Sequence, residues 1–234
     1  MKRYILCIST VLAITYACDR RTSRLATFEV HGIDVSHHQQ AIDWNRIAAQ
    51  DVQFAFVKAS EGITFNDPLF CHNWDEMQRV RLRRGAYHFF RPTVPARQQA
   101  HNFIDRVELT YGDLPPVLDV EVLDGVSKPA LIAGIKSWLF TVELHYGIKP
   151  ILYTNLKFYN KYLAGHFEGY SLWIARYNDR QPTLACGSPW QFWQYGNRGQ
   201  IDGIQGDVDF NVFHASLDAL DSLCLKPKPV LSGR

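Results

Sequence analysis

The stretch "PVLDVEVLDG", residues 116–125, places two carboxylates, Asp119 and Glu121, inside a run of apolar residues. Such a run, bounded by Pro and Gly, indicates a buried strand. Side chains alternate across a strand, so the two acids share one face while Leu118 and Val120 occupy the other. A buried strand with two acids on one face predicts a chemical site at its carboxyl end.

Five more runs have the same character. Each is short, nearly continuous in apolar residues and separated from the next by a stretch with helical periodicity, as expected for parallel strands covered on both faces. They occupy residues 30–36, 53–60, 85–90, 150–155 and 171–177.

Two helices are clearly marked between these strands. In residues 127–147, apolar residues repeat at helical spacing, Ser127 can cap the start and Gly147 can close the end. A second helical pattern covers residues 95–112 and includes Tyr111 in its apolar set. Alternation of strands with helices predicts a parallel sheet.

The last third of the chain differs. After Tyr177 come short runs punctuated by glycine, with no helix before the end of this region. We therefore predict an α/β fold, an irregular β/α barrel resembling a TIM barrel, with about five β/α units followed by plain strands; an open doubly wound sheet is the alternative. The predicted domain spans residues 30–225, after a linker at 18–29 and before a tail at 226–234.

Residues 1–17 resemble an export signal. Lys2 and Arg3 precede an apolar run at residues 4–14 that is too short for a stable membrane anchor, and small residues precede Cys18. We expect a lipoprotein-type signal with Cys18 lipidated; ordinary cleavage or a retained segment are the alternatives. The expected location is the cell envelope, membrane-anchored through Cys18, or otherwise the periplasm or the medium.

The net charge and the cysteine content limit which ligands and cross-links are expected. The formal net charge is +2 and falls to zero if Lys2 and Arg3 leave with the signal, so no nucleic acid partner is expected. Cys71, Cys186 and Cys224 remain in the domain, an odd number without zinc-site spacing, with a Cys186–Cys224 disulfide left open. We expect a monomer that needs no cofactor.

Two further acids lie near predicted strand ends, Asp34 in "HGIDVS" and Asp209 in "GDVDFN". Each by itself could be a strand-end cap or half of an ion pair. Barrels of this type carry their active sites at the carboxyl ends of the strands. Two acids about 7 Å apart at Cα on one strand, partly desolvated, should raise at least one pKa, which suits a general acid.

The motifs together resemble glycoside hydrolase family 25, the N-acetylmuramidase type of lysozyme, from about residue 31 to about residue 213. In order they are "GIDVSHHQ", "FVKASEG", "GAYHFF", "PVLDVE", "YTN", "WQY" and "VDFN". The resemblance implies an irregular β/α barrel that cleaves the β-1,4 bond between N-acetylmuramic acid and N-acetylglucosamine in the glycan strands of peptidoglycan. Gln40 departs from the family, which often has Gly there, and this affects the expected shape of a loop beside the site.

The resemblance also implies roles for the four acids. Glu121 matches the general acid, and Asp119 matches the partner carboxylate that stabilises positive charge or orients the substrate's acetamido group. Asp34 and Asp209 match supporting acids of the same pocket. Because both Asp119 and Glu121 project from one strand, we expect the substrate's own acetamido oxygen to act as nucleophile, with net retention at the anomeric carbon.

Aromatic residues near strand ends supply flat surfaces of the kind that pack against sugar rings. The expected sugar contacts are Tyr87, Phe89, Tyr153, Trp173, Trp193 and Tyr195. For each ring by itself, core packing is as good an explanation.

Two other functions compete with glycoside hydrolysis. A metal-dependent hydrolase could use the acids with His37 and His38, although adjacent histidines in a turn are not spaced as ligands, so we expect no metal site. A cell-wall-binding barrel without catalysis would gain nothing from the like-charge pair Asp119 and Glu121.

Overall fold

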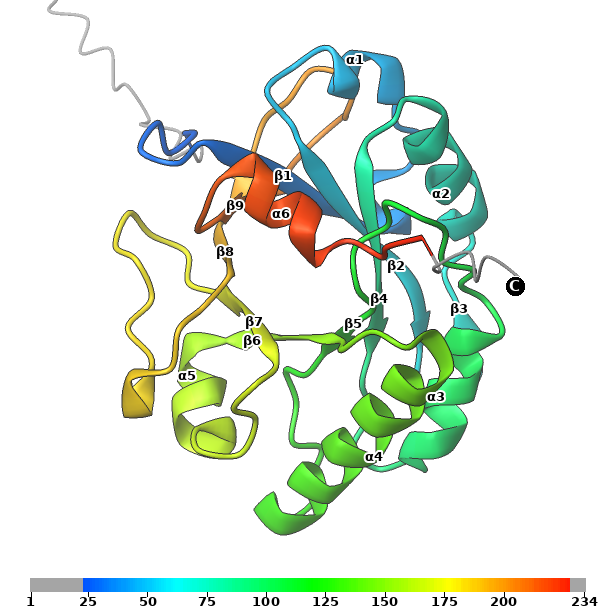
Figure 1. The fold of residues 1–234 in the computed structure, drawn as a ribbon, viewed down its shortest axis with the longest axis vertical. Coiled ribbons are helices and arrows are strands. Elements are labelled where there is room, and N and C mark those ends of the chain that lie inside the picture. Colours follow the sequence, from blue (N-terminus) through cyan, green and yellow to red (C-terminus); the bar gives the residue numbers. More distant parts are fainter. Residues whose placement is uncertain (1–22, 228–234) are drawn as a thin grey trace, which may run out of the picture.

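The computed structural model describes residues 23–227, in which eight strands close into a barrel and a ninth pairs at its rim (Figure 1). The predicted signal, Cys18 and residues 228–234 lie outside the described residues. The strands are β1 (Val30–Val35), β2 (Phe54–Glu61), β3 (Phe65–Asn66), β4 (Arg83–Phe89), β5 (Val117–Asp119), β6 (Ile151–Asn155), β7 (Ser171–Ala175), β8 (Phe192–Gly199) and β9 (Val208–Phe213).

The barrel closes because β1 has a partner on each side. It pairs in parallel with β2 and antiparallel with β9. From β2 through β4, β5, β6, β7 and β8 every pairing is parallel, whereas β9 runs antiparallel to both of its neighbours. The predicted irregular β/α barrel is confirmed, and the open sheet is excluded.

Helices follow β1, the β2–β3 hairpin, β4, β5 and β6, which confirms the expectation of about five β/α units (Figure 1). They are α1 (Trp44–Ala48), α2 (Phe70–Arg79), α3 (Ala96–Ile104), α4 (Lys128–Tyr146) and α5 (Leu156–Phe158), the last continued by the π-helical turn Tyr159–Leu163. The remaining helical elements are two 3-10 turns, His37–Gln39 and Ala185–Gly187, and α6 (Leu217–Leu223).

The two predicted helices have different outcomes. In α4 the Ser127 hydroxyl accepts a bond from a backbone N–H of the first turn, and Gly147 ends the helix at φ 70°, as expected. The prediction for residues 95–112 is wrong in its second half, because α3 ends at Ile104. The chain then turns toward β5, and Tyr111 is exposed rather than part of an apolar face.

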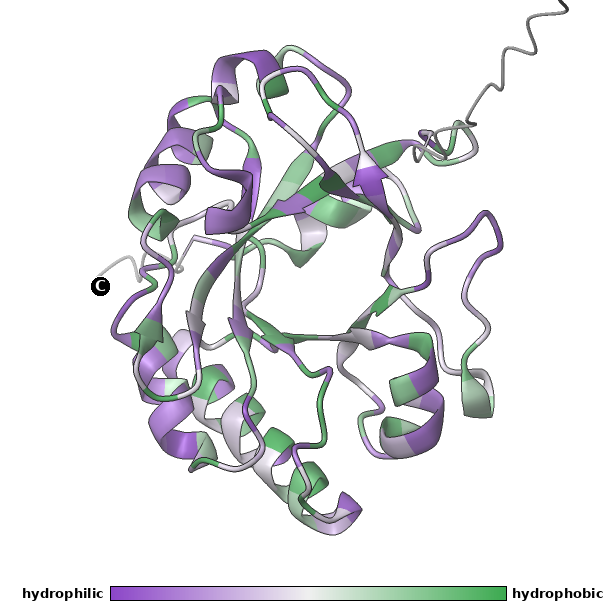
Figure 2. Cartoon of the chain, turned by 180° about the vertical axis from the view of Figure 1, so that it is seen from behind, coloured by the Kyte–Doolittle hydropathy of each residue, from purple (hydrophilic) through white to green (hydrophobic). Residues whose placement is uncertain are grey.

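Alternation along the strands divides the apolar residues into two cores. Leu118 and Val120 of the β5 segment belong to the large core between barrel and helices. The opposite strand faces fill the barrel interior with a second core that includes Phe56, Val117 and Trp173. Green, hydrophobic segments alternate with purple, hydrophilic ones along the strands, and the helices also show both colours (Figure 2).

One end of the barrel is closed by α6. Leu220 and Cys224 are buried in the interior core, and an ion pair joins Asp221 to Arg83 at the start of β4. The backbone of Leu225 donates to Asp113, just before β5. The helix therefore covers the amino ends of the strands and leaves the carboxyl ends for the site.

No α-helix lies in the connections between β7, β8 and β9, as the glycine-rich sequence predicted. The outer face of β8 is covered instead by aromatic residues. Trp193 packs against Phe28 and Trp190, with ring centroids 6.0 Å from each. This side of the barrel is thus insulated by rings rather than by a helix.

The disulfide left open between Cys186 and Cys224 is absent. Cys186 is exposed in the connection between β7 and β8, whereas Cys224 is buried at the end of α6, and both are free, as is Cys71.

Within residues 23–227, none of the helices combines the length and apolar character that a bilayer crossing requires.

Candidate active site

The four predicted acids converge inside the barrel near the carboxyl end of β5. Asp119 ends that strand and Glu121 follows two residues later, while Asp34 on β1 and Asp209 on β9 are directly paired. They line a pocket of about 120 Å³. Its other lining residues are Tyr87, Tyr153, Trp173, Tyr177 and Gln194.

Asp119 and Glu121 form the first acid pair. Burial, then the charge of Glu121, raises the pKa of Asp119 well above its usual range, and burial also raises the pKa of Glu121. The pair therefore retains a proton at pH values where isolated carboxyls are ionised. One oxygen of Asp119, Oδ1, is buried without a hydrogen-bond partner among the described residues.

Asp34 and Asp209 form the second pair. Burial, then the neighbouring charge of Asp209, raises the pKa of Asp34, and burial raises the pKa of Asp209 to about 6. Asp34 Oδ2 accepts hydrogen bonds from Asn211 Nδ2 at 2.7 Å and from Gln194 Nε2 at 2.8 Å. This pair is held by amide donors, so its geometry is fixed from within the protein.

Gln194 is the hub of the pocket, and the sequence prediction missed it. Its Nε2 donates to both Asp34 and Asp209, at 2.8 and 3.1 Å. Its Oε1 accepts from the hydroxyls of Tyr153 at 2.8 Å and Tyr177 at 3.1 Å. One sequence feature could have predicted its orientation. Gln194 lies between the rings of Trp193 and Tyr195 in "WQY", so in a regular strand it points to the opposite face from both rings.

Three of the predicted sugar-contacting rings line the pocket: Tyr87, Tyr153 and Trp173. Trp173 is the most enclosed of them, because it stacks on Phe56 with centroids 4.4 Å apart and its Nε1 donates to Asn211. Tyr177, which was not predicted, adds a fourth ring. It is half exposed at the pocket, with a hydroxyl pointing inward to Gln194.

The other three predicted rings lie elsewhere. Phe89 lies outside the pocket lining, with its ring 5.2 Å from Lys58 Nζ. Trp193 and Tyr195 point outward from β8 into the core between barrel and surface, and Trp193 Nε1 donates to the backbone of Arg176. Their position corrects the expectation of sugar contact for these two residues, because both rings are buried on the wrong face of the strand.

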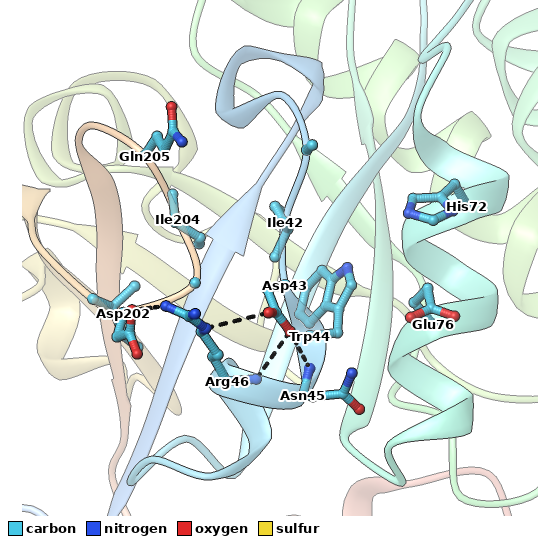
Figure 3. A pocket seen from close by; sticks show the side chains of 13 residues that line it. Ile42, Asp43, Trp44, Asn45, Arg46, His72, Glu76, Asp202, Ile204 and Gln205 are labelled. Atoms are coloured by element: carbon cyan, nitrogen blue, oxygen red, sulfur yellow. Dashed lines mark hydrogen bonds and ion pairs between the residues drawn. The ribbon is translucent and has the colours of Figure 1, made fainter.

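A larger cavity, of about 700 Å³, lies on the barrel flank between α1, α2 and the loop before β9 (Figure 3). Its charged side chains already have ion-pair partners: Arg46 pairs with Asp43 and with Asp202, and Glu76 pairs with Arg79. Asp43 also caps α1 through the backbone of Asn45. Size alone therefore does not identify the reactive site; the small pocket has the converging acids.

The histidines of the metal-hydrolase alternative do not join the acids. His37 Nδ1 lies 2.7 Å from Asp67, whose carboxylate also accepts from the His37 backbone, and His38 packs on His37. Across residues 23–227, no three His, Cys, Asp or Glu side chains are grouped so that they could hold a metal ion.

The comparisons with known proteins identify the family. The family model for glycosyl hydrolases family 25 matches residues 33–204. The chain is 45% identical over 202 residues to the uncharacterized protein YegX of Escherichia coli K12, covering 84% of this chain and 74% of that protein. It is 32% identical over 225 residues to lysozyme M1 of Streptomyces globisporus, covering 88% of this chain and 75% of that protein.

Among solved structures, a family 25 glycosyl hydrolase from Bacillus anthracis superposes with a TM-score of 0.83 at 31% identity. The match covers 88% of this chain and 99% of that one. The sequence motifs and the barrel topology agree with these matches. The chain belongs to glycosyl hydrolase family 25.

Proposed function

We propose that this protein is a muramidase that hydrolyses the β-1,4 bond between N-acetylmuramic acid and N-acetylglucosamine in peptidoglycan. Family membership makes it a glycoside hydrolase, and its lysozyme and muramidase relatives support peptidoglycan as the substrate class. The observation that supports the finer assignment best is the acid pair: two carboxyls two residues apart, inside a ring-lined pocket, with raised pKa values.

In this mechanism Glu121 protonates the leaving oxygen. Burial raises its pKa, so it holds its proton to a higher pH than an exposed glutamic acid does, which favours a general acid. The same group then takes a proton from the incoming water, since acid and base roles reverse between the two halves of a retaining reaction.

Asp119 serves the substrate's acetamido group. Its Oδ1 is buried and lacks a hydrogen-bond partner among residues 23–227, so it is available to accept the acetamido N–H. Once the acetamido oxygen attacks the anomeric carbon, positive charge develops on that group, and the Asp119 carboxylate stabilises it. A nucleophile from the protein is then unnecessary.

The rings and the second acid pair position the sugar. Tyr87, Tyr153 and Tyr177 present ring faces and hydroxyls around the acids. Gln194 bridges Asp34 and Asp209, and because burial raises the pKa of both, the pair holds a proton for sugar hydroxyls to a higher pH than exposed carboxyls do.

Digestion of purified cell walls tests the proposal. Glu121→Gln preserves shape but cannot donate a proton, so turbidity loss should slow at least about a hundredfold while wall binding persists. Asp218→Asn, in the first turn of α6, is the matched control. Borohydride reduction of the products, followed by mass spectrometry, should yield N-acetylmuramitol ends. N-acetylglucosaminitol ends would contradict the proposed bond. If the protein binds walls without cleaving them, it is a wall-binding barrel. Inhibition by a chelator would favour the metal-dependent hydrolase.

We also propose export and lipidation at Cys18, supported by the pattern of residues 1–18. Mass spectrometry of the mature amino terminus from the native host tests both steps. An intact Met1 would contradict export, and an unmodified Cys18 at the mature terminus would contradict lipidation.

A further inference from the structure

A β-bulge interrupts β2 beside the site. Lys58 pairs with Tyr87 of β4 and Ser60 pairs with His88, so Ala59 is an extra residue on the β2 side. In an unbroken strand, Lys58 and Glu61 would point to opposite faces, because they are three residues apart. The bulge reverses that relationship, as bulges near active sites commonly re-aim side chains.

The consequence is an ion pair inside the barrel rim. Lys58 Nζ lies 2.6 Å from Glu61 Oε2, and the two side chains are 12% and 22% exposed. On the outer side of the strand Ala59 is buried in the apolar core, and Ser60 bonds to His88. With the bulge, Ala59 and Ser60 both point outward, whereas Lys58 and Glu61 both point into the barrel.

This pair continues into a chain of alternating charges. Arg91, two residues past β4, donates to Glu61 Oε1 at 2.6 and 2.8 Å. Its other terminal nitrogen lies 3.6 Å from Asp124. Asp124 adopts φ 46° in the turn three residues after Glu121. The chain therefore links the strand bearing Lys58 to the loop that carries the general acid.

Lys58 is level with Tyr87 of β4, and Tyr87 is level with Val117 of β5, so only β4 separates Lys58 from the strand that ends at Asp119. The charge of Lys58 lowers the pKa of both Asp119 and Glu121, against the effect of burial, whereas the charge of Glu61 raises the pKa of Asp119. The other titratable groups facing the pair are Asp34 from β1, Asp209 from β9, Tyr87 from β4, Tyr153 from β6 and Tyr177 after β7. None of the described residues that line the pocket is cationic.

We propose that the chain Lys58–Glu61–Arg91–Asp124, created by the bulge in β2, positions the acid pair, with the Lys58 ammonium as an inward positive charge and Glu61 as its counter-ion. This inference rests on the muramidase function proposed above. The four residues are positioning residues, because they act through Asp119 and Glu121.

The inference predicts shifts of opposite sign in the pH profile of kcat/KM. Lys58→Met removes the positive charge, so both limbs should move to higher pH by at least about half a unit. Glu61→Gln leaves Lys58 without its neutralising partner, so both limbs should move to lower pH. Lys58→Arg retains the charge and should keep the limbs near those of the unaltered enzyme.

The experiment is a pH–rate series on a soluble, uncrosslinked peptidoglycan fragment. Lys136→Met, on the exposed face of α4, is the matched control and should leave the limbs unmoved. Partial unfolding would lower the rate at every pH without moving the limbs, and if Lys58→Met does not fold, Glu61→Gln still tests the sign. Unmoved limbs, or shifts in the same direction for both variants, would overturn the inference. Absence of muramic reducing ends from the unaltered enzyme would instead reject the proposed function.

Discussion

Gln194 donates a hydrogen bond to Asp34 across the barrel interior, with Nε2 and Oδ2 2.8 Å apart. The same nitrogen reaches Asp209 at 3.1 Å. A neutral amide therefore lies between two carboxyls that would otherwise repel one another, and it connects them to the hydroxyls of Tyr153 and Tyr177. The second acid pair and two of the pocket rings are thus parts of one network.

Replacing the hub should damage both stability and activity. Gln194→Met has a similar length but can neither donate to the two acids nor accept from the tyrosines. We expect a loss of about 1–3 kcal/mol in the free energy of unfolding, from unpaired buried groups, and at least about a tenfold fall in kcat/KM. Urea unfolding and wall digestion measure the two effects. Gln205→Met, at an exposed position, is the control, and equal behaviour of the two variants would show that the hub contributes nothing.

Asp119→Asn should change the shape of the pH profile as well as the rate. The amide cannot ionise, so the limb that reports ionisation of Asp119 should disappear from kcat/KM while the limb of Glu121 remains. The fall in kcat should be at least about tenfold, with a smaller change in KM, because the lost stabilisation is greatest in the transition state. If the profile keeps both limbs, the limb ascribed to Asp119 belongs instead to Asp34 or Asp209.

The stabilisation that protonated Asp209 contributes should be lost as the pH rises from about 4 through about 6. Burial raises the pKa of Asp209 from its ordinary 3.8 to about 6 in the folded state, so its folded form binds a proton more tightly than the unfolded chain does. The stabilisation is complete below the unfolded pKa and is lost as pH rises through the folded pKa.

Asp209→Asn isolates this effect. Between about pH 5 and about pH 7.5, the unaltered protein should lose about 1.4 kcal/mol more unfolding free energy than the variant. Buried His88, whose pKa is lowered to about 4, contributes equally to both proteins and cancels in the comparison. Urea unfolding at the two pH values measures the difference, and parallel pH dependences would refute the prediction.

Cleavage should proceed with retention. If the acetamido oxygen is the nucleophile, the new reducing end forms first as the β-anomer and mutarotates afterwards. Proton NMR on a soluble glycan fragment in the first minutes of reaction distinguishes the anomers. Glycan de-N-acetylated at the cleaved muramic acid should be nearly inert, and its rapid cleavage would point to a protein nucleophile or direct attack by water.

Substitution of aromatic residues should affect KM on the inner face of the barrel wall and stability on the outer face. Tyr87→Leu removes a ring from the pocket, so KM should rise severalfold with little change in stability. Trp193→Leu removes a fully buried ring from the outer core, so unfolding free energy should fall by about 2–5 kcal/mol with KM unchanged. Melting curves and steady-state kinetics on both variants provide the comparison, and a raised KM in the Trp193 variant would return that ring to the substrate site.

The sequence predicted the barrel because its parallel strands are short, apolar and separated by helical patterns. It also predicted that Asp119 and Glu121 share a face, since a residue spacing of two fixes this in any regular strand. Strands such as β8 gave less information. Rings occupy both faces of β8, Phe192 inward and Trp193 and Tyr195 outward, so aromatic character alone does not reveal which rings point inward.

Long-range contacts account for the remaining errors. The helical pattern of residues 95–112 continues past Ile104, yet the chain there must turn back to start β5, and Tyr146 donates to the backbone of Val107 in that turn. The role of Gln194 could not be predicted from the sequence, because its four hydrogen-bond partners come from β1, β6, β9 and the connection after β7. Only the closed barrel brings them together.

The helix α6 determines how a polymer must approach. Because α6 and the interior core obstruct the amino ends of the strands, the barrel has one entrance, and a glycan strand cannot thread through it. The strand has to lie across the mouth, where a bond in the middle of a chain is as reachable as one near its tip. We therefore expect endo action: long strands should first yield long fragments, with disaccharides accumulating only late in digestion.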